Sequence, residues 1–229
     1  MTGKQRAGER AAEFVQDGMI VGLGTGSTVY WTIRRLGELT RRGLQIRAVP
    51  TSRRTETLAL EERIPLTSFD SVDELDLTID GADEVSPSLA LIKGGGGALL
   101  REKLVAAASR KLVIVVDNSK LVPVLGRFPL PVEIVPFAWE VTLRRVAAVG
   151  CMPVRRQAND EPFRSDNGNY ILDCPFRTIA DPEALHQTLK LLPGVVETGL
   201  FVGMTDVVVV GSDDSDNVDL LTSSGLQSH

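Results

Sequence analysis

Acidic and basic side chains next to glycine-rich segments are the residues best suited to chemistry in this sequence. Only two histidines occur, His186 and His229, so neither a histidine-rich metal site nor a Ser-His-Asp triad is expected. The two cysteines, Cys151 and Cys174, match no CxxC or zinc spacing, and we interpret them as buried or half-buried thiols in a reducing compartment. Catalysis would therefore rest on carboxylates and lysines.

The segment TIDGADE at residues 78–84 carries three carboxylates, those of Asp80, Asp83 and Glu84. Asp80 and Asp83 bracket Gly81 and Ala82 after a β-branched run, so both carboxylates could face one cleft. A structural alternative is that Asp80 caps the turn through its backbone. The spacing alone does not separate these two interpretations.

The segment IKGGGGALLREK at residues 92–103 joins Lys93 to four glycines and then to a helical pattern. Glycines allow the backbone to approach a ligand closely and to turn its N–H groups toward an anion. Glu102 lies in this helix with apolar neighbours three and four positions away, which makes it a candidate for a raised pKa. The helical pattern by itself favours a solvated glutamate.

Two further segments follow predicted strands. GLGTGST at residues 22–28 has a glycine-rich turn, with the hydroxyls of Ser27 and Thr28 before a helix, a combination that suits a phosphate. It fits dinucleotide, P-loop and methyltransferase-like patterns poorly, and a tight turn without a ligand is the structural alternative. Lys120 in DNSK at residues 117–120 could reach a phosphate, although a lone loop lysine is more often only solvated.

The order of predicted elements indicates an α/β fold. Strands and helices alternate through the first half, which predicts a Rossmann-like, mostly parallel sheet covered by helices. The strands are expected at 19–23, 44–49, 75–79 and 111–116, and the helices at 27–42, 52–63 and 98–110. Ligand groups at the ends of these strands would meet at one edge of the sheet.

The second half predicts a small ferredoxin-like (split βαβ) α+β domain in the order β-α-β-β-α-β. Its best local signal is Asn167-Gly168, which predicts a hairpin turn. We therefore place a catalytic domain at 1–126 plus 200–229 and the small domain at 127–199. The strand at 207–210 is expected to return to the first sheet, and the acidic, serine-rich tail from Ser212 is expected to be frayed.

Composition excludes several classes of function. Hydrophobic residues make up 43% of the 229 residues, and no apolar run is long enough to span a membrane. The net charge is −5 without a basic block, so nucleic acid is not an expected partner. The polar start of the chain predicts that the protein is not exported, and a cytoplasmic location is expected.

These motifs in this order resemble the A-type ribose-5-phosphate isomerase family. The resemblance rests on GLGTGST (22–28), DGADEV (80–85), IKGGGGALLREK (92–103), and DNSK (117–120) leading into LGRFPLPVEIVPFA (125–138). NGNYILDC (167–174) and PGVVETGLF (193–201) resemble the second domain of the family. The tail is not part of the family pattern.

The resemblance implies a cofactor-independent, metal-free aldose–ketose isomerase acting on ribose 5-phosphate and ribulose 5-phosphate, a homodimer or homotetramer with a small sugar phosphate as partner. It makes Glu102 the proton acceptor, assigns sugar-hydroxyl and ring-opening roles to Asp80 and Asp83, and places Lys93 beside the reacting oxygens. The full set of implied substrate-binding positions is Lys4, Thr25, Gly26, Ser27, Thr28, Asp80, Gly81, Ala82, Asp83, Lys93, Gly94, Gly95, Gly96 and Lys120.

Two other functions are compatible with this fold. A non-catalytic sugar-phosphate sensor would carry an added helix-turn-helix segment and a basic patch, which this acidic chain lacks. A CoA-transferase-like enzyme would instead use the glutamate as a group that becomes acylated.

Overall fold

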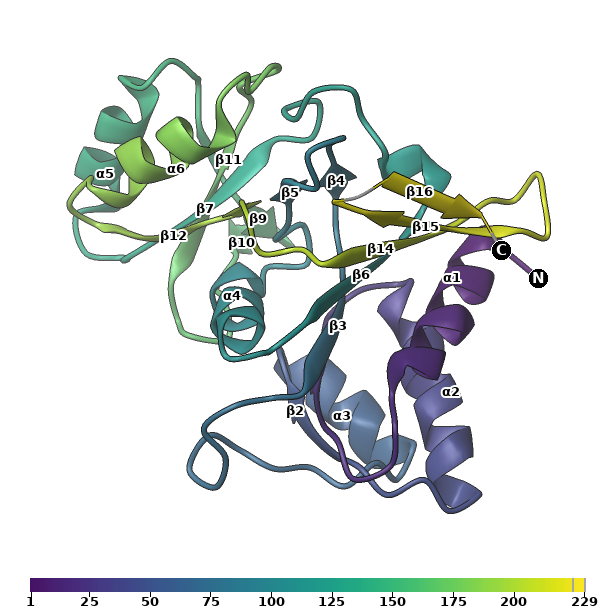
Figure 1. Ribbon diagram of the computed structural model, residues 1–229. Helices are drawn as coiled ribbons and strands as arrows, with labels where there is room; N and C mark the ends of the chain where they lie inside the picture. Colours follow the sequence, from purple (N-terminus) through teal and green to yellow (C-terminus); the bar gives the residue numbers. More distant parts are fainter. Residues whose placement is uncertain (224, 229) are drawn as a thin grey trace. The chain divides into compact units, whose positions relative to one another are not determined.

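The computed structural model describes residues 1–223 and 225–228, and it is organised as two compact units (Figure 1). Unit 1 comprises Met1–Ala82, Arg101–Leu121 and Met204–His229, and unit 2 comprises Asp83–Leu100 and Val122–Gly203. The domain predicted at 127–199 lies within unit 2. The segment 83–100, which the sequence analysis assigned to the first domain, groups with unit 2: its two short strands pair with each other, and the second of them also pairs with a strand at residues 200–201.

The described residues of unit 1 form a seven-stranded sheet in the order β16-β15-β14-β6-β3-β1-β2. The strands from β14 to β2 run parallel, whereas β15 and β16 are antiparallel to their neighbours. This arrangement confirms the predicted Rossmann-like sheet. The strands are β1 (Ile20–Leu23), β2 (Arg47–Pro50), β3 (Leu77–Gly81), β6 (Leu112–Asp117), β14 (Val207–Gly211), β15 (Val218–Thr222) and β16 (Gly225–Ser228).

Alternating side chains of the central strands point to the two opposite faces of the sheet. The face that packs on helices α1 and α2 contains Leu23, Ile79, Val115 and Val209, all fully buried. The opposite face carries Gly22, Thr78 and Asp80. Helix α4 packs closely on this face: a Cβ added at Gly22 would lie only 2.6 Å from Val105 of α4. The helical elements are α1 (Gly3–Ala11), η1 (Ala12–Phe14), α2 (Val29–Arg41), α3 (Arg53–Glu61), α4 (Leu99–Ala107) and η2 (Asn118–Lys120).

Unit 2 contains a four-stranded antiparallel sheet in the order β12-β7-β11-β8. With helices α5 (Trp139–Ala147) and α6 (Pro182–Lys190), it has the predicted ferredoxin-like element order. A second sheet has the order β13-β5-β4, and β9 and β10 form a separate hairpin. The strands are β4 (Glu84–Val85), β5 (Leu91–Ile92), β7 (Leu130–Ile134), β8 (Val154–Arg155), β9 (Gln157–Ala158), β10 (Glu161–Pro162), β11 (Tyr170–Cys174), β12 (Val195–Thr198) and β13 (Leu200–Phe201).

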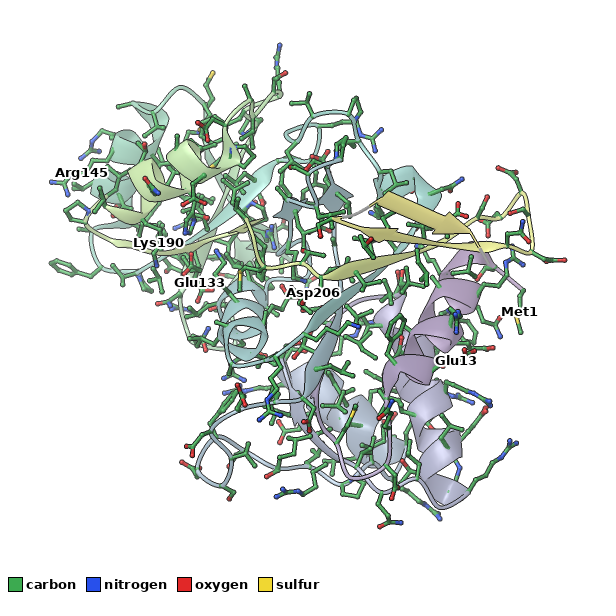
Figure 2. The ribbon with its side chains drawn as sticks, viewed as in Figure 1. Met1, Glu13, Glu133, Arg145, Lys190 and Asp206 are labelled. Atoms are coloured by element: carbon green, nitrogen blue, oxygen red, sulfur yellow. The ribbon has the colours of Figure 1, made fainter. Side chains whose placement is uncertain are left out.

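The turn predicted at Asn167-Gly168 is present, with the Gly168 N–H donating to Ser165 O at 2.9 Å, but the flanking strands β10 and β11 do not pair with each other, so the predicted hairpin is wrong. β9 and β10 pair across Asn159 and Asp160, which both have positive φ, whereas β11 pairs with β7 and β8. The Asn167-Gly168 segment is instead a loop tied to the buried Glu133 of β7, labelled in Figure 2. Its carboxylate accepts hydrogen bonds from the side chains of Ser165, Asn167 and Asn169 at 2.8, 3.2 and 2.9 Å.

The frayed tail predicted from Ser212 is also wrong for its described part. β15 pairs with β14 over five residue pairs, from Val207↔Thr222 to Gly211↔Val218. Val218 and Leu220 alternate into the apolar core with exposed fractions of 9% and 8%. The acidic run before them forms the connection between two paired strands. In the part of the chain that the structure describes, no helix has the length and apolar character needed to cross a membrane.

Candidate active site

The turn after β1 places its polar groups at the carboxyl edge of the sheet in unit 1. β1 ends at Leu23, and α2 begins at Val29, so residues 24–28 form the strand-to-helix connection. Gly26 has φ +139°, and the N-cap Thr28 makes no side-chain capping bond. The side chain of Thr28 is buried whereas Ser27 is exposed. A turn of this kind before a helix N-terminus is suited to binding a phosphate.

Asp80 is fully buried at the end of β3, beside this turn. Its Oδ1 accepts hydrogen bonds from the backbone N–H groups of Thr25 at 3.0 Å and Gly81 at 2.7 Å. Gly24 leaves the necessary space, since a Cβ there would lie 2.1 Å from that oxygen. Asp80 thus both fastens the turn, as the structural alternative required, and belongs to the carboxyl edge.

Glu102 lies in the first turn of α4 and is 4% exposed. α4 belongs to the connection between the parallel strands β3 and β6, so it runs back across the sheet and its N-terminus lies at the carboxyl edge. Glu102 precedes Val105 by three residues and therefore shares the helix face that packs over Gly22. The solvated glutamate favoured by the helical pattern is wrong, and Glu102 occupies the same face of the sheet as Asp80.

Lys120 and Lys4 both lie near the end of β6. Lys120 ends η2, which is capped by Asp117, whose Oδ1 accepts the N–H of Ser119 at 3.0 Å. Lys4 of α1 lies with its Nζ 3.9 Å from Asp117 Oδ2. Unit 1 therefore brings Thr25–Thr28, Asp80, Glu102 and both lysines to the carboxyl ends of β1, β3 and β6.

Unit 2 brings together Asp83, Lys93 and the glycines. Asp83 precedes β4 and Lys93 follows β5; because these strands are antiparallel, the two residues lie at the same end of the pair, and Asp83 N–H donates to Ile92 O at 2.8 Å. Lys93 is 2% exposed, with its Nζ 5.3 Å from the centre of the Phe201 ring. A buried lysine is unusual outside structural ion pairs and functional sites.

The four glycines have different structural requirements. Gly94 and Gly97 have φ values of +101° and +82°, which disfavour other residues. Gly95 donates its N–H to Asp83 Oδ2 at 2.7 Å, and a Cβ at this position would lie 2.5 Å from the other carboxylate oxygen. Gly95 and Gly96 are exposed, whereas Gly94 and Gly97 are buried.

Sequence reasoning missed two groups of residues around these positions. In unit 1, the Thr25 hydroxyl lies 2.9 Å from the Thr51 hydroxyl, 2.8 Å from that of Ser52 and 3.1 Å from that of Thr55. The pair Thr51-Ser52, directly after β2, was the available signal, because it also follows a strand. In unit 2, Arg156 donates hydrogen bonds to glycine carbonyls, and no sequence pattern indicated this contact.

No group of three or more His, Cys, Asp or Glu side chains among the described residues is arranged to hold a metal ion. In each unit, the predicted site positions offer backbone N–H or ammonium groups that donate hydrogen bonds and carboxylates that accept them, and unit 1 adds hydroxyls. This donor set suits a small phosphorylated, hydroxyl-bearing molecule.

The fold and these groups define an α/β protein with polar groups gathered at the carboxyl edge of a Rossmann-like sheet. The family model of ribose 5-phosphate isomerase A (phosphoriboisomerase A) matches residues 47–215. The chain is 59% identical over 210 residues to ribose-5-phosphate isomerase A of Bacillus cereus, covering 91% of this chain and 96% of that protein. It is 54% identical over 213 residues to ribose-5-phosphate isomerase A 1 of Oceanobacillus iheyensis, covering 93% and 95%.

Solved structures give the same result. Ribose 5-phosphate isomerase from Plasmodium falciparum is 39% identical with a TM-score of 0.92, covering 96% of this chain and 97% of that one. A D-ribose-5-phosphate isomerase in complex with phospho-erythronic acid is 38% identical with a TM-score of 0.90, covering 99% and 96%. The chain belongs to the ribose 5-phosphate isomerase A family.

Proposed function

We propose that this protein interconverts D-ribose 5-phosphate and D-ribulose 5-phosphate, a step of the non-oxidative pentose phosphate pathway. Identity above 50% over more than nine-tenths of the chain to proteins that bear this name carries the proposal. The reaction moves a proton between C2 and C1 and passes through an enediolate. A base for the proton and donors for the developing negative charge are therefore required.

Glu102 is the proposed base. Its side chain is almost completely buried, and an acid–base group held in this way supplies on the order of 100- to 10,000-fold in rate. It lies in the first turn of α4, at the carboxyl edge of the sheet. Asp80 and the turn that follows β1 lie at the same edge. The same Glu102 carboxylate would take the proton from one carbon and return it to the other.

Lys93 and the backbone N–H groups of the glycine segment are the proposed donors to the enediolate oxygens. Loss of one donor of this kind typically costs on the order of 3 kcal/mol of transition-state stabilisation. Burial of Lys93 strengthens its electrostatic effect, since little water screens the ammonium group.

Asp80 and Asp83 are the proposed groups for ring opening and for binding sugar hydroxyls. Ribose 5-phosphate binds mainly as a closed ring, so an acid–base group must assist its opening, and we assign this step to Asp80. Asp80 has one oxygen, Oδ1, engaged by two backbone N–H groups, which fixes the orientation of the carboxylate. Asp83 is held by the Gly95 N–H at 2.7 Å.

The turn Thr25–Thr28 together with Lys120 and Lys4 is the proposed phosphate site. Helix N–H groups, hydroxyls and ammonium groups all favour a phosphate dianion. Binding energy from the phosphate, which does not react, can orient C1 and C2 at the base. The mechanism uses no cofactor and no metal in any step.

The central experiment compares the wild-type protein with Glu102→Gln, using ribose 5-phosphate as the only added reactant. Ribulose 5-phosphate should form with the wild type, whereas the variant should keep its fold and bind phospho-erythronic acid but lose nearly all turnover. The matched control is Glu133→Gln, because Glu133 is an equally buried glutamate whose Oε1 contacts would survive the change. Wild-type turnover by Glu102→Gln would overturn the mechanism.

The same assay tests the two other functions. A sugar-phosphate sensor would bind ribose 5-phosphate without converting it. A CoA-transferase-like enzyme would need a CoA thioester and would form an acylated glutamate detectable by mass spectrometry.

We also propose that the protein acts in the cytoplasm as a homodimer or homotetramer. The two free cysteines are compatible with a reducing compartment. Light scattering measures the oligomeric state directly, and a monomer at micromolar concentration would contradict this proposal.

A further inference from the structure

Arg156 contacts the glycine segment through its guanidinium group, entirely within unit 2. Its Nη1 donates to the carbonyl oxygen of Gly94 at 2.8 Å and to that of Gly95 at 3.1 Å. These are consecutive peptide units in the segment that separates Lys93 from α4. Hydrogen bonds from a charged donor are about twice as strong as neutral ones.

The guanidinium is itself held in place on several sides. Asp173 of β11 accepts from Nε at 3.0 Å and from Nη2 at 2.5 Å, a bidentate pair. The side chain of Arg156 is 14% exposed, and its guanidinium carbon lies 5.7 Å from the centre of the Phe163 ring. Its backbone N–H donates to Ile171 O at 2.8 Å, so the residue is fixed to the sheet. Because the guanidinium is fixed in this way, it can hold the Gly94 and Gly95 carbonyls in one orientation.

The direction of the two carbonyls determines the direction of two N–H groups. In a trans peptide the C=O and N–H of one unit point in opposite directions, and all described peptide bonds are trans. The carbonyls of Gly94 and Gly95 point at Arg156, so the N–H groups of Gly95 and Gly96 point away from it. The Gly95 N–H meets Asp83 Oδ2 at 2.7 Å.

A continuous series of contacts therefore runs from Asp173 through Arg156 and the Gly94–Gly95 peptide to the carboxylate of Asp83. The guanidinium also polarises these peptide units, which strengthens their N–H groups as donors. Arg156 itself lies on the carbonyl side of the segment, opposite to the N–H groups.

We propose that Arg156, anchored by Asp173, is a positioning residue that sets the orientation of the Gly95 and Gly96 N–H groups and, through Gly95, of the Asp83 carboxylate. The inference rests on the proposed isomerase function only for the role of these groups toward the sugar. Lysine cannot replace Arg156 fully, because a single ammonium group cannot form the bidentate pair with Asp173 and reach both carbonyls in the same plane.

The test compares Arg156→Met and Arg156→Lys with Arg155→Met as the matched control. Arg155 is the adjacent residue and ends β8, but its guanidinium carbon lies 4.1 Å from the Trp139 ring and 5.3 Å from the Tyr170 ring instead of at the glycines. Arg156→Met should lower kcat/KM for ribose 5-phosphate on the order of 100-fold, the effect of a misplacement of about 1 Å. Arg156→Lys should give a smaller loss in the same direction, and Arg155→Met should stay near the wild type.

A double-mutant cycle separates positioning from a purely structural role. If Arg156 acts through Asp83, the loss caused by Arg156→Met should be much smaller in an Asp83→Ala background. Additive losses would overturn the route through Asp83, and Arg156 variants with wild-type kcat/KM would overturn the whole proposal. If Arg156→Met does not fold, the same cycle is run with Arg156→Lys.

Hydrogen exchange provides a readout that does not depend on turnover. The Gly95 amide should exchange faster in Arg156→Met than in the wild type or in Arg155→Met, because its bond to Asp83 is released. An inactive wild-type protein would refute the isomerase function, but the exchange rate of the Gly95 amide would still test whether Arg156 positions this peptide. Unchanged exchange at Gly95 would refute the positioning role even in an active enzyme.

Discussion

Replacement of Gly95 by alanine is the sharpest test of the geometry around Asp83. A Cβ at position 95 would lie 2.5 Å from Asp83 Oδ1 and 3.0 Å from its carboxylate carbon, whereas an ordinary contact begins at 3.4 Å. The carboxylate must therefore move by about 0.9 Å. Misplacement of a substrate-positioning group by about 1 Å costs on the order of 100-fold in rate, or about 2.7 kcal/mol of transition-state stabilisation.

The same substitution should leave the folded state intact. Gly95 is not among the glycines with positive φ, so its backbone accepts alanine without left-handed strain. The glycine is also exposed, and the loss of backbone entropy in the unfolded chain favours alanine by about 0.4–1 kcal/mol. The weakened hydrogen bond between Gly95 N–H and Asp83 offsets this gain, so urea unfolding should show a midpoint close to that of the wild type, whereas steady-state kinetics show the loss in kcat/KM.

Gly97→Ala is the informative contrast. Gly97 has φ +82°, and a Cβ there would lie 2.3 Å from the Phe163 ring. This variant should lose about 1–3 kcal/mol of stability through overpacking, which Gly95→Ala should not. Wild-type kcat/KM in Gly95→Ala would refute the assignment of Asp83. The assignment would also be refuted if Gly95→Ala lowered kcat/KM by the same factor in an Asp83→Ala background, because the overlap between the Cβ and the Asp83 carboxylate is absent there.

Three further predictions concern stability and thiol reactivity. Glu84→Gln should lower the free energy of unfolding by about 1–3 kcal/mol, measured with urea, because this buried carboxylate accepts two backbone N–H groups and glutamine can satisfy only one of them with its oxygen. Leu220→Ala should cost about 2 kcal/mol in the same experiment, because Leu220 packs in the core of unit 1; an unchanged midpoint would restore the interpretation of a frayed tail. The hydrogen bond between the two thiols lowers the pKa of Cys151 and, with burial, raises that of Cys174. Alkylation by iodoacetamide should therefore begin at Cys151 as the pH rises, and Cys174→Ala should shift its onset to higher pH; faster labelling of Cys174 would contradict this order.

Much of the fold follows from local pattern. The β-branched runs that became β1, β3 and β6 alternate with helical segments, and this alternation specifies a parallel sheet because parallel strands require crossover connections. Strand ends of such a sheet share one edge, so the positions of Asp80 and Lys120 could be predicted. The order of elements in the small domain was also predictable, because apolar strand runs and helical runs follow one another along the chain in the β-α-β-β-α-β order.

Pairing between distant strands was not predictable in this way. The tail looked polar because its first residues are acidic, yet Val218 and Leu220 alternate at the period of a half-buried strand. This alternation leads to a paired strand only because the edge of β14 is available to form hydrogen bonds with it. The short strands β4 and β5 pair with each other, and they join unit 2 because β13, more than a hundred residues away in the chain, pairs with β5.

The sequence by itself determined the class of fold, the motifs of the family and the candidate groups of the site, because these depend on residue type and on spacing along the chain. Only the tertiary structure decided that Glu102 is buried, that Asp83 is held by Gly95, and that Arg156 and Asp173 lie behind the glycines. Burial and hydrogen-bond partners depend on residues far apart in the chain, which helical periodicity cannot indicate. The four consecutive glycines illustrate what each source of information provides. Their presence predicts a close approach of the backbone, whereas the structure shows that Asp83, Phe163 and Arg156 are the groups that approach it.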